Sequence, residues 1–319
     1  MPFDLGVVMD PIATIKPHKD STFAMMLAAQ ARGWPLWYME MADLFVADGR
    51  CHARMRPVQV RDAKEHWYTL GPERVAPLDA LPAVLMRKDP PVDMEYVHAT
   101  QLLELAERHG TLVVNRPAAL RDLNEKLATA WFPECCVPAR VTRDCAALAA
   151  FLDEQGDVVI KPLDAMGGQS IFRVRSDDPN RNVIFETLTG DGTRYALAQR
   201  YIPEIREGDK RILLIDGEAV PYALARVPKA GETRGNLAAG GTGHGVALSE
   251  RDRWIAARVG PVLRERGVLF AGIDVIGDWL TEVNITSPTC IRELDAAYGL
   301  DIAGQLIECV GTQLARRGR

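Results

Sequence analysis

Long apolar stretches are missing from this sequence. No apolar run approaches the ~20 residues that a membrane-spanning helix requires, and the first residues, MPFDLGVVMDP, carry no basic segment of the kind that opens a signal peptide. An excess of positive charge is missing as well, because the net charge is −5. This balance is unlike that of a nucleic-acid-binding surface. We therefore expect neither a membrane nor a nucleic acid as a partner.

Closely spaced cysteine pairs are also missing. No two of the six cysteines are separated by two residues, so the spacing typical of structural zinc does not occur. Cys135 and Cys136 are adjacent, which is poor geometry for a structural disulfide. We interpret all six cysteines as reduced thiols and predict a cytoplasmic protein.

The composition is that of a globular protein. Of the 319 residues, 47% are hydrophobic and 25% are charged, and a chain of this length is expected to form two or three domains. Residues 1–120 alternate between short apolar strands and helices, which predicts a parallel sheet covered by helices. The expected strands are Leu5–Met9, Leu36–Met41, Ala83–Arg87 and Thr111–Asn115, and the expected helices run from Asp20 or Ser21 to Arg32 and from Asp93 to His109. The segment 43–81 is expected to be irregular.

Polar residues stand at the ends of three of these strands. Asp10, Arg87 and Asn115 lie where ligands of parallel sheets usually bind, beyond the carboxyl ends of the strands. The alternative for each of the three is an ordinary loop residue without a ligand. Arg87, which is flanked by Lys88 and Asp89, is the one that we expect to contact a ligand.

Further elements follow in the rest of the chain. A hairpin at Val158–Lys161 and Ile171–Val174 encloses Gly167-Gly168, whose backbone N–H groups suit a phosphate, although most such loops are only turns. Lys161 favours the phosphate interpretation, because a lysine among apolar strand residues needs an anionic partner. Other expected elements are helices at Asn124–Trp131, Asp144–Gln155, Ser249–Arg266 and from Asp301 onward on the outside, a turn at Glu207–Arg211, and strands at Tyr195–Ile202, Ile212–Ile215 and Ala219–Val227.

A second hairpin carries three oxygen-bearing side chains in apolar surroundings. Asp274, Glu282 and Asn284 interrupt two expected strands, Val268–Val275 and Leu280–Ile285. A buried carboxylate needs a partner, and Mg²⁺ prefers oxygen ligands. The hairpin is therefore predicted to hold a hard cation, and the alternative is an edge hairpin with solvated acids.

The turn of this hairpin decides whether the three side chains can meet. Glu282 and Asn284 share one strand face because they are two residues apart. Asp274 joins them only if it pairs with Glu282, whereas a plain two-residue turn would pair it with Thr281. We therefore predict an odd-residue turn, Gly277–Trp279, with a bulge.

Glycine is concentrated in residues 228–245. This stretch has almost no large apolar side chain, so it is unsuited to a core and is expected to be a loop. A long loop in a compact domain is usually functional, and an active-site lid fits. The alternative is a disordered surface excursion.

Taken together, these pieces resemble the prokaryotic glutathione synthetases of the ATP-grasp superfamily. The similar segments run in the family's order along nearly the whole chain. They are LGVVMDP at 5–11, MRKDPP at 86–91, NEKL at 124–127, IKPLDAMGGQSIFRV at 160–174, GDKRILLIDGE at 208–218, ETRGNLAAGGTG at 232–243 and GIDVIGDWLTEVNITSPTCIRE at 272–293.

The resemblance implies an α/β (α+β) ATP-grasp fold of three domains. Residues 1–122 would form an N-terminal Rossmann-like parallel-sheet domain for substrate, and residues 123–202 a central lid domain. Residues 203–319 would form a C-terminal antiparallel-sheet domain with the metal site and the glycine-rich lid loop. ATP would lie between the two ATP-grasp sheets.

The resemblance also implies roles for individual residues. The metal, Mg²⁺ or Mn²⁺, would be held by Asp274, Glu282 and Asn284. ATP would be bound by Lys126, Lys161, Met166, Gly167, Gly168, Gln199, Arg200, Tyr201, Ile202, Asp209 and Arg211. The peptide substrate would contact Arg87, Arg234, Gly241, Ser287, Cys290 and Arg292. Arg211, Arg234 and Arg292 would stabilise charge during catalysis, and Gly240 with Gly241 would let the lid close.

The implied reaction joins glycine to γ-glutamylcysteine at the expense of ATP. The peptide carboxylate attacks the γ-phosphate, and the acyl phosphate then accepts the glycine amine, giving glutathione, ADP and phosphate. A homotetramer is expected from the same resemblance. Two alternatives stay open at this point: an ATP-grasp ligase for another carboxylate and amine, and an ATP-binding module without catalysis.

Overall fold

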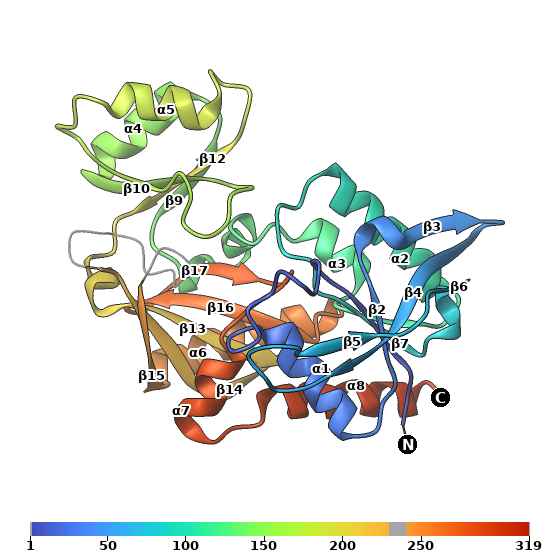
Figure 1. Ribbon diagram of the computed structural model, residues 1–319. Coiled ribbons are helices and arrows are strands. Elements are labelled where there is room, and N and C mark those ends of the chain that lie inside the picture. The colour runs from blue at the N-terminus through green and yellow to red at the C-terminus, as the bar shows by residue number, and fades with distance from the viewer. Residues whose placement is uncertain (1, 230–240, 319) are drawn as a thin grey trace.

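Three sheets organise the part of the chain that the computed structural model describes, residues 2–229 and 241–318 (Figure 1). The first lies in the N-terminal part, the second in a small unit that projects from the rest at the top of Figure 1, and the third in the C-terminal part.

The N-terminal sheet contains the predicted parallel strands. The strand β1 (Leu5–Val8) pairs in parallel with β2 (Leu36–Met39) and with β7 (Ala83–Met86), and β7 pairs in parallel with β8 (Leu112–Val114). All four strands are apolar and largely buried, as a sheet with both faces covered requires. Their carboxyl ends therefore lie along one edge.

The predicted N-terminal helices are confirmed, and each begins after an aspartate that caps it. The helix α1 (Ser21–Ala31) begins after Asp20, whose carboxylate accepts a hydrogen bond from the backbone N–H of Phe23. The helix α2 (Met94–Arg108) begins after Asp93, which accepts in the same way from Tyr96. Such caps satisfy N–H groups that the helix itself leaves free.

The segment 43–81 is not irregular, which corrects the expectation. It forms an antiparallel ribbon with two short 3₁₀ turns, η1 (Met41–Asp43) and η2 (Leu78–Ala80). The ribbon's strands are β3 (Leu44–Ala47), β4 (Arg50–Val60), β5 (Tyr68–Leu70) and β6 (Arg74–Pro77). Alternate residues of β4 are buried, but they include Cys, Ala and Met. Because none of these is a β-branched or aromatic residue of the kind enriched in strands, the alternation is hard to see in the sequence.

The central unit is a four-stranded sheet in the order β11-β10-β12-β9. Two helices, α4 and α5, cover one face with a core that includes Phe151, Val158 and Ile160. The elements are β9 (Ala139–Thr142), α4 (Cys145–Gln155), β10 (Asp157–Pro162), β11 (Phe172–Arg175), α5 (Arg181–Thr189) and β12 (Ala196–Arg200). Since Val158 and Ile160 point into this core, Val159 and Lys161 must point to the opposite face.

The chain between the first two sheets is mostly 3₁₀. The helix predicted over Asn124–Trp131 is wrong: α3 (Pro117–Asp122) ends earlier, and the 3₁₀ turns η3 (Leu127–Trp131) and η4 (Pro133–Cys135) follow. The side chain of Asn124 accepts hydrogen bonds from the N–H groups of Lys126 and Leu127. Asn124 thus caps the start of this segment, as Asp20 caps α1, but the turns that follow are 3₁₀ rather than α-helical.

The C-terminal sheet is antiparallel, in the order β15-β14-β13-β16-β17. Its strands are β13 (Asp209–Ile215), β14 (Glu218–Val227), β15 (Thr242–Ala247), β16 (Phe270–Ile276) and β17 (Trp279–Asn284). Two expectations are corrected here. Residues 209–211 belong to β13 rather than to a turn, and residues 242–245 belong to the edge strand β15 rather than to a loop.

Helices close the C-terminal part. A short 3₁₀ turn, η5 (Pro203–Glu207), leads into the sheet. The helix α6 (Glu250–Glu265) starts at a capping box of Ser249 and Asp252, and α7 (Ile291–Tyr298) and α8 (Ile302–Arg316) follow. The helix α8 was expected to lie on the outside of the molecule. Instead, its residues Ile302, Leu306 and Val310 are buried in a core shared with α1. The last helix therefore ties the two ends of the chain together (Figure 1).

Candidate active site

A cavity of about 580 Å³ is lined by residues from all three sheets. The carboxyl ends of β1 and β7 contribute Met9, Asp10 and Arg87 to its wall. Most of the predicted site residues line it as well. They are Arg87, Lys126, Lys161, Met166, Gly167, Gly168, Gln199, Arg200, Tyr201, Ile202, Asp209, Arg211, Asp274, Glu282, Asn284, Ser287 and Cys290.

The hairpin of β16 and β17 brings its three oxygen-bearing side chains together. Asp274 pairs with Glu282 and Gly272 with Asn284, as the three-residue site requires. The predicted odd-residue turn is wrong, because Ile276 pairs with Trp279 and leaves a two-residue turn. The predicted bulge is present: the register shifts between Asp274 and Val275, so Thr281 is the extra residue. The extra residue lies in the strand rather than in the turn.

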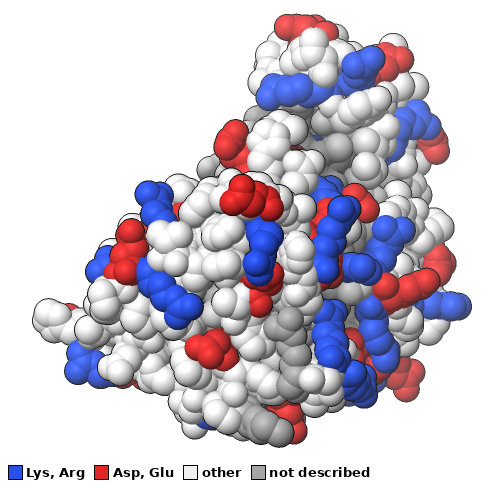
Figure 2. All heavy atoms as spheres, turned by 90° about the vertical axis from the view of Figure 1, so that its right-hand side faces the viewer, with Lys and Arg blue, Asp and Glu red and all other residues white. Residues whose placement is uncertain are grey.

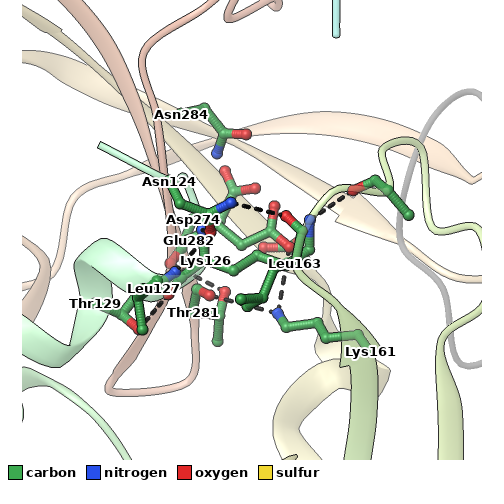
Figure 3. A network of polar contacts seen from close by, with 12 residues as sticks. Asn124, Lys126, Leu127, Thr129, Lys161, Leu163, Asp274, Thr281, Glu282 and Asn284 are labelled. Atoms are coloured by element: carbon green, nitrogen blue, oxygen red, sulfur yellow. Dashed lines mark hydrogen bonds and ion pairs between the residues drawn. The ribbon is translucent and has the colours of Figure 1, made fainter. Parts of the chain in front are cut away.

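The bulged residue also contacts its surroundings. The Thr281 hydroxyl donates to the carbonyl of Asp274 at 3.1 Å, and its own carbonyl accepts from Lys161 Nζ at 3.5 Å. Figure 3 shows Asp274, Glu282 and Asn284 gathered at this hairpin, with Lys126 and Lys161 reaching it from neighbouring segments. The bulge thus places two acids and an amide opposite two lysines.

Four charged side chains form a buried quartet in the C-terminal sheet. Asp274 binds Arg211 through two hydrogen bonds, one of them 2.8 Å from Nη2, and its Oδ2 lies 2.9 Å from Nη2 of Arg226. Arg226 also lies 2.5 Å from Oδ2 of Asp209. None of the four is more than 8% exposed. Burial alone would raise the pKa of Asp274, but Arg211 and Arg226 outweigh it and hold that pKa below its usual range.

Asp209 shows the opposite balance. Burial raises its pKa to about 6, although Arg226 opposes the shift. Its Oδ1 atom is buried without a hydrogen-bond partner, as is Nε2 of the neighbouring cavity residue Gln199. A buried acceptor and a buried donor that face a cavity without partners are suited to a polar ligand.

Two buried lysines face the hairpin. Lys161 is 5% exposed, and its Nζ lies 3.2 Å from Oε1 of Glu282. Lys126 is 6% exposed, and its Nζ donates to the carbonyl of Ala165 at 2.5 Å. Burial would raise the pKa of Glu282, but the two lysines outweigh it and the pKa is lowered. Glu282 is therefore ionised at neutral pH.

The short loop at 166–168 follows the strand that carries Lys161. Gly167 and Gly168 have φ values of 64° and 81°, a region that glycine adopts without strain. A Cβ at Gly167 would meet nothing within 4 Å, so the requirement at this position is conformational rather than one of space. Met166 beside them is 42% exposed at the cavity.

The strand-end residues have different surroundings. Arg87 is 5% exposed and donates to Thr22 Oγ1 at 3.1 Å and to the carbonyl of Pro288 at 2.9 Å. Asn115, in contrast, bonds the backbone of Leu269, Phe270 and Ile285 with both its oxygen and its nitrogen. Asn115 is therefore a joint between two sheets, whereas Arg87 contacts the turn at the cavity.

That turn carries Ser287 and Cys290. Cys290 is 1% exposed and has φ 89°, an unusual value for a residue other than glycine. Burial raises the pKa of its thiol, although Arg211 and Arg226 oppose the shift. The thiol is therefore protonated near neutral pH.

Some predicted residues are not brought to the cavity. Arg292 lies in the first turn of α7, and its guanidinium pairs with Asp62 at 2.8 Å. Gly241 directly precedes the edge strand β15 and is absent from the cavity wall. Arg234 and Gly240, with most of the predicted lid, lie outside the described residues.

Two important residues were missed from the sequence. Arg226 is a single cation in the apolar strand β14, so the reasoning that selected Lys161 would have found it as well. Glu125 lines the cavity beside Lys126, and its carboxylate accepts hydrogen bonds from Ile285 and Thr286. A glutamate in a polar connecting segment carries no comparable signal.

Three further observations concern features beyond the cavity. Basic and acidic side chains are intermixed on the face shown in Figure 2. Within residues 2–229 and 241–318, no group of three or more His, Cys, Asp and Glu side chains is arranged to hold a metal. None of the helices in this part of the chain combines the length and apolar character needed to traverse a bilayer.

Comparison with protein families gives two matches that together span most of the chain. Residues 3–121 match the N-terminal domain of prokaryotic glutathione synthetase, and residues 125–299 match its ATP-grasp domain. Among similar proteins, the glutathione synthetase of Pseudomonas putida is 58% identical over 313 residues, which are 98% of this chain and 99% of that protein. The glutathione synthetase of Shewanella oneidensis is 57% identical over 312 residues, which are 98% and 99% of the two chains.

Solved structures of similar fold are more distant in sequence. The D-cycloserine synthetase DcsG superposes with a TM-score of 0.66 at 14% identity, covering 97% of this chain and 99% of that one. The ATP-grasp ligase PsnB, complexed with a precursor variant, Mg and ADP, gives 0.62 at 16% identity over 100% of both chains. At these identities the likeness concerns the ATP-grasp fold.

Proposed function

Because this chain belongs to the prokaryotic glutathione synthetase family, we propose that its cavity joins glycine to γ-glutamylcysteine with ATP, giving glutathione, ADP and phosphate. The observation that carries this proposal is the single cavity in which two buried lysines, an acidic hairpin and the turn after β17 meet. Such a site can hold a nucleotide and a carboxylate substrate together, which phosphoryl transfer requires.

The nucleotide is proposed to lie between the central and C-terminal sheets. Lys126 and Lys161 would contact its phosphates, and the N–H groups of Gly167 and Gly168 would cover them. Residues 199–202 would read the adenine, and Asp209 would accept a hydrogen bond from the ribose. The unpartnered Oδ1 of Asp209 and Nε2 of Gln199 support this placement, since each needs a polar contact.

The hairpin residues fit a hard divalent cation, with unequal roles. The Asn284 amide nitrogen donates to the carbonyl of Gly272, so its oxygen is free to act as a ligand. Glu282 is ionised and partly exposed to the cavity, whereas both oxygens of Asp274 already bind arginines. We therefore propose Glu282 and Asn284 as direct ligands and Asp274 as the residue that orients Arg211. Bound Mg²⁺ or Mn²⁺ would neutralise phosphate charge.

The peptide is proposed to bind at the carboxyl ends of the N-terminal strands. Arg87 has no carboxylate partner within ion-pair distance among the described residues, so a substrate carboxylate would satisfy its buried charge. Ser287 and Cys290 would line the same end of the cavity. A substrate carboxylate held near the γ-phosphate would attack it, and Arg211 would stabilise the developing charge.

The experiment is a substrate panel assayed for ADP, phosphate and product. ADP release is expected to require γ-glutamylcysteine and to rise when glycine is added, with glutathione identified by mass spectrometry. Replacing γ-glutamylcysteine by glutamate or D-alanine is expected to abolish release. Turnover with another carboxylate and amine, and none with γ-glutamylcysteine, would instead assign a different ligase. Nucleotide binding without turnover of any pair would leave a non-catalytic module.

Three broader expectations belong to the same proposal. The domains are proposed to be residues 1–122, 123–202 and 203–319, and the protein is proposed to be a cytoplasmic homotetramer. Family membership supports the assembly, and so do the exposed side chains Phe45, Val46 and Val75 on the β3–β4–β6 ribbon. Light scattering coupled to size-exclusion chromatography measures the assembly directly.

A further inference from the structure

Glu125 connects to the hairpin through both its backbone and its side chain. Its carbonyl accepts from the N–H of Val283 at 2.8 Å. Its Oε1 accepts from the N–H of Ile285 at 2.9 Å, from the N–H of Thr286 at 3.1 Å and from Thr286 Oγ1 at 2.8 Å. Four donors from three residues, one at the end of β17 and two directly after it, therefore converge on one glutamate.

These contacts cover a free sheet edge. The strand β17 is the last strand of the C-terminal sheet, so its outer N–H groups have no neighbouring strand. A backbone N–H beside a buried cavity needs a partner. Glu125 supplies that partner at 283 and 285, the positions that flank Asn284. The proposed ligands Glu282 and Asn284 are thus held from outside as well as by β16.

The residues on either side of Glu125 reach in another direction. Lys126 Nζ donates to the carbonyl of Ala165 at 2.5 Å, and Asn124 Nδ2 donates to that of Leu163 at 3.0 Å (Figure 3). Both carbonyls belong to the segment that leads from β10 into the loop at 166–168. Three consecutive residues, 124–126, therefore join the phosphate side of the cavity to the acidic hairpin.

We infer that Glu125 is a positioning residue that couples the placement of Lys126 to that of Glu282 and Asn284. A carboxylate that accepts several N–H and O–H donors binds them more firmly than a neutral acceptor does. Loss of its charge would let the end of β17 shift relative to the lysine. This inference rests on the proposed function, because it concerns the residues proposed there to hold nucleotide and metal.

The test measures ADP binding by calorimetry, with and without Mg²⁺, on the full-length protein. In Glu125→Gln the gain in ADP affinity that Mg²⁺ provides is expected to fall about tenfold. The reason is that the hydrogen bonds from Ile285 and Thr286 would then go to a neutral amide rather than to a carboxylate. Thr286→Val, which removes one of the donors, is expected to lower the gain about threefold. ADP affinity without Mg²⁺ is expected to change less than about twofold, since Lys126 and Lys161 are kept.

Glu104→Gln is the matched control. Glu104 pairs with Arg121 at 2.6 Å but does not line the cavity, so its loss is expected to affect stability alone. An Mg²⁺ gain in Glu125→Gln and Thr286→Val equal to that of the wild type, with only a lower melting temperature, would make Glu125 a structural residue and overturn the inference.

A second readout needs neither nucleotide nor turnover. Hydrogen exchange followed by mass spectrometry is expected to be about tenfold faster in Glu125→Gln in two segments, 283–286 and 163–166. Faster exchange in 283–286 alone would show a local bond without coupling and would contradict the inference. Failure of the wild type to make glutathione would overturn the proposed function, whereas the exchange result would still decide the coupling.

Discussion

The C-terminal sheet and the central sheet bury charge in different ways. In the C-terminal sheet Asp209, Arg211, Arg226 and Asp274 are paired with one another, and none is more than 8% exposed although all four line the cavity. In the central sheet Lys161 is a buried cation whose ion-pair partner, Glu282, belongs to the opposite sheet. The charges of the first arrangement are paired within one sheet, whereas the ion pair of the second forms only across the cavity.

This difference separates two tasks. Charges that neutralise each other inside one sheet form a fixed framework, and removing one leaves the others buried without a partner. A cation that reaches across a cavity can exchange its partner for a ligand phosphate. Substitution of Asp274 is therefore expected to act mainly on stability, and substitution of Lys161 mainly on binding.

The largest effect is expected from Asp274→Asn. The change leaves Arg211 and Arg226 with one carboxylate between them, so the free energy of unfolding is expected to fall by about 3–5 kcal/mol. Urea denaturation followed by circular dichroism measures it. Asp62→Asn is the control, because Asp62 is 61% exposed in its pair with Arg292 and its loss is expected to have a far smaller effect. An equal loss of unfolding free energy in both variants would show that the buried quartet contributes no more to stability than an exposed ion pair does.

The next largest effect is expected from Lys161, the buried cation of the central sheet. Lys161→Met is expected to weaken ATP binding about a hundredfold, because a buried phosphate contact is lost. The free energy of unfolding is expected to change by less than about 1 kcal/mol, since Glu282 is partly exposed to the cavity. Calorimetry and urea denaturation measure the two quantities. Lys64→Met, at an exposed lysine, is expected to change neither. A large loss of stability with intact binding would reverse the assignment.

A pH-dependent effect is expected within the quartet itself. Burial raises the pKa of Asp209 to about 6, from 3.8 in the unfolded chain. Between these values the folded state binds more protons than the unfolded state. The contribution of Asp209 to the free energy of unfolding therefore falls as the pH rises, by at most about 1.4 kcal/mol per pH unit.

Comparing the wild type with Asp209→Asn by denaturation at several pH values tests this sign. The free energy of unfolding of the wild type, minus that of Asp209→Asn, is expected to fall as the pH rises from 4 to 6. If this quantity rose with pH instead, pairing with Arg226 would outweigh burial and the pKa of Asp209 would be lowered.

The smallest effect is expected from Arg292→Ala. The guanidinium binds the exposed Asp62 outside the cavity, so kcat is expected to change less than about threefold. Steady-state kinetics measures it, with Arg211→Ala as the contrasting variant. A loss as large as that of Arg211→Ala would place Arg292 in the reaction despite its position in this structure.

Much of the fold could be predicted because local patterns agree with it. Asp20, Asp93 and Ser249 stand directly before apolar helical segments, and each caps the helix that follows. The parallel strands are continuous apolar runs. The ribbon at 43–81 was missed because β4 buries Cys51, Ala53 and Met55. What decides its structure is pairing with β2, β3 and β6, which the sequence does not display.

The site could be predicted where a single residue contradicts its surroundings. Lys161 and Asp274 are charges in apolar strands, and each forms an ion pair with an opposite charge. Which residues these charged side chains contact could not be predicted in the same way. The contact of Arg211 with Asp274 joins residues that are 63 positions apart in the chain, and the contact of Glu125 with Ile285 joins residues that are 160 positions apart.

The bulge at Thr281 has a consequence for changes in chain length. Loss of one codon within a strand normally turns all later side chains to the opposite face. Without residue 281, however, Val275–Leu280 and Asp274–Glu282 would become consecutive pairs of a regular ladder. Leu280 would still point inward and Glu282 toward the cavity. Loss of codon 283 would instead turn Asn284 into the core, so this hairpin tolerates a one-residue deletion only on one side of Glu282.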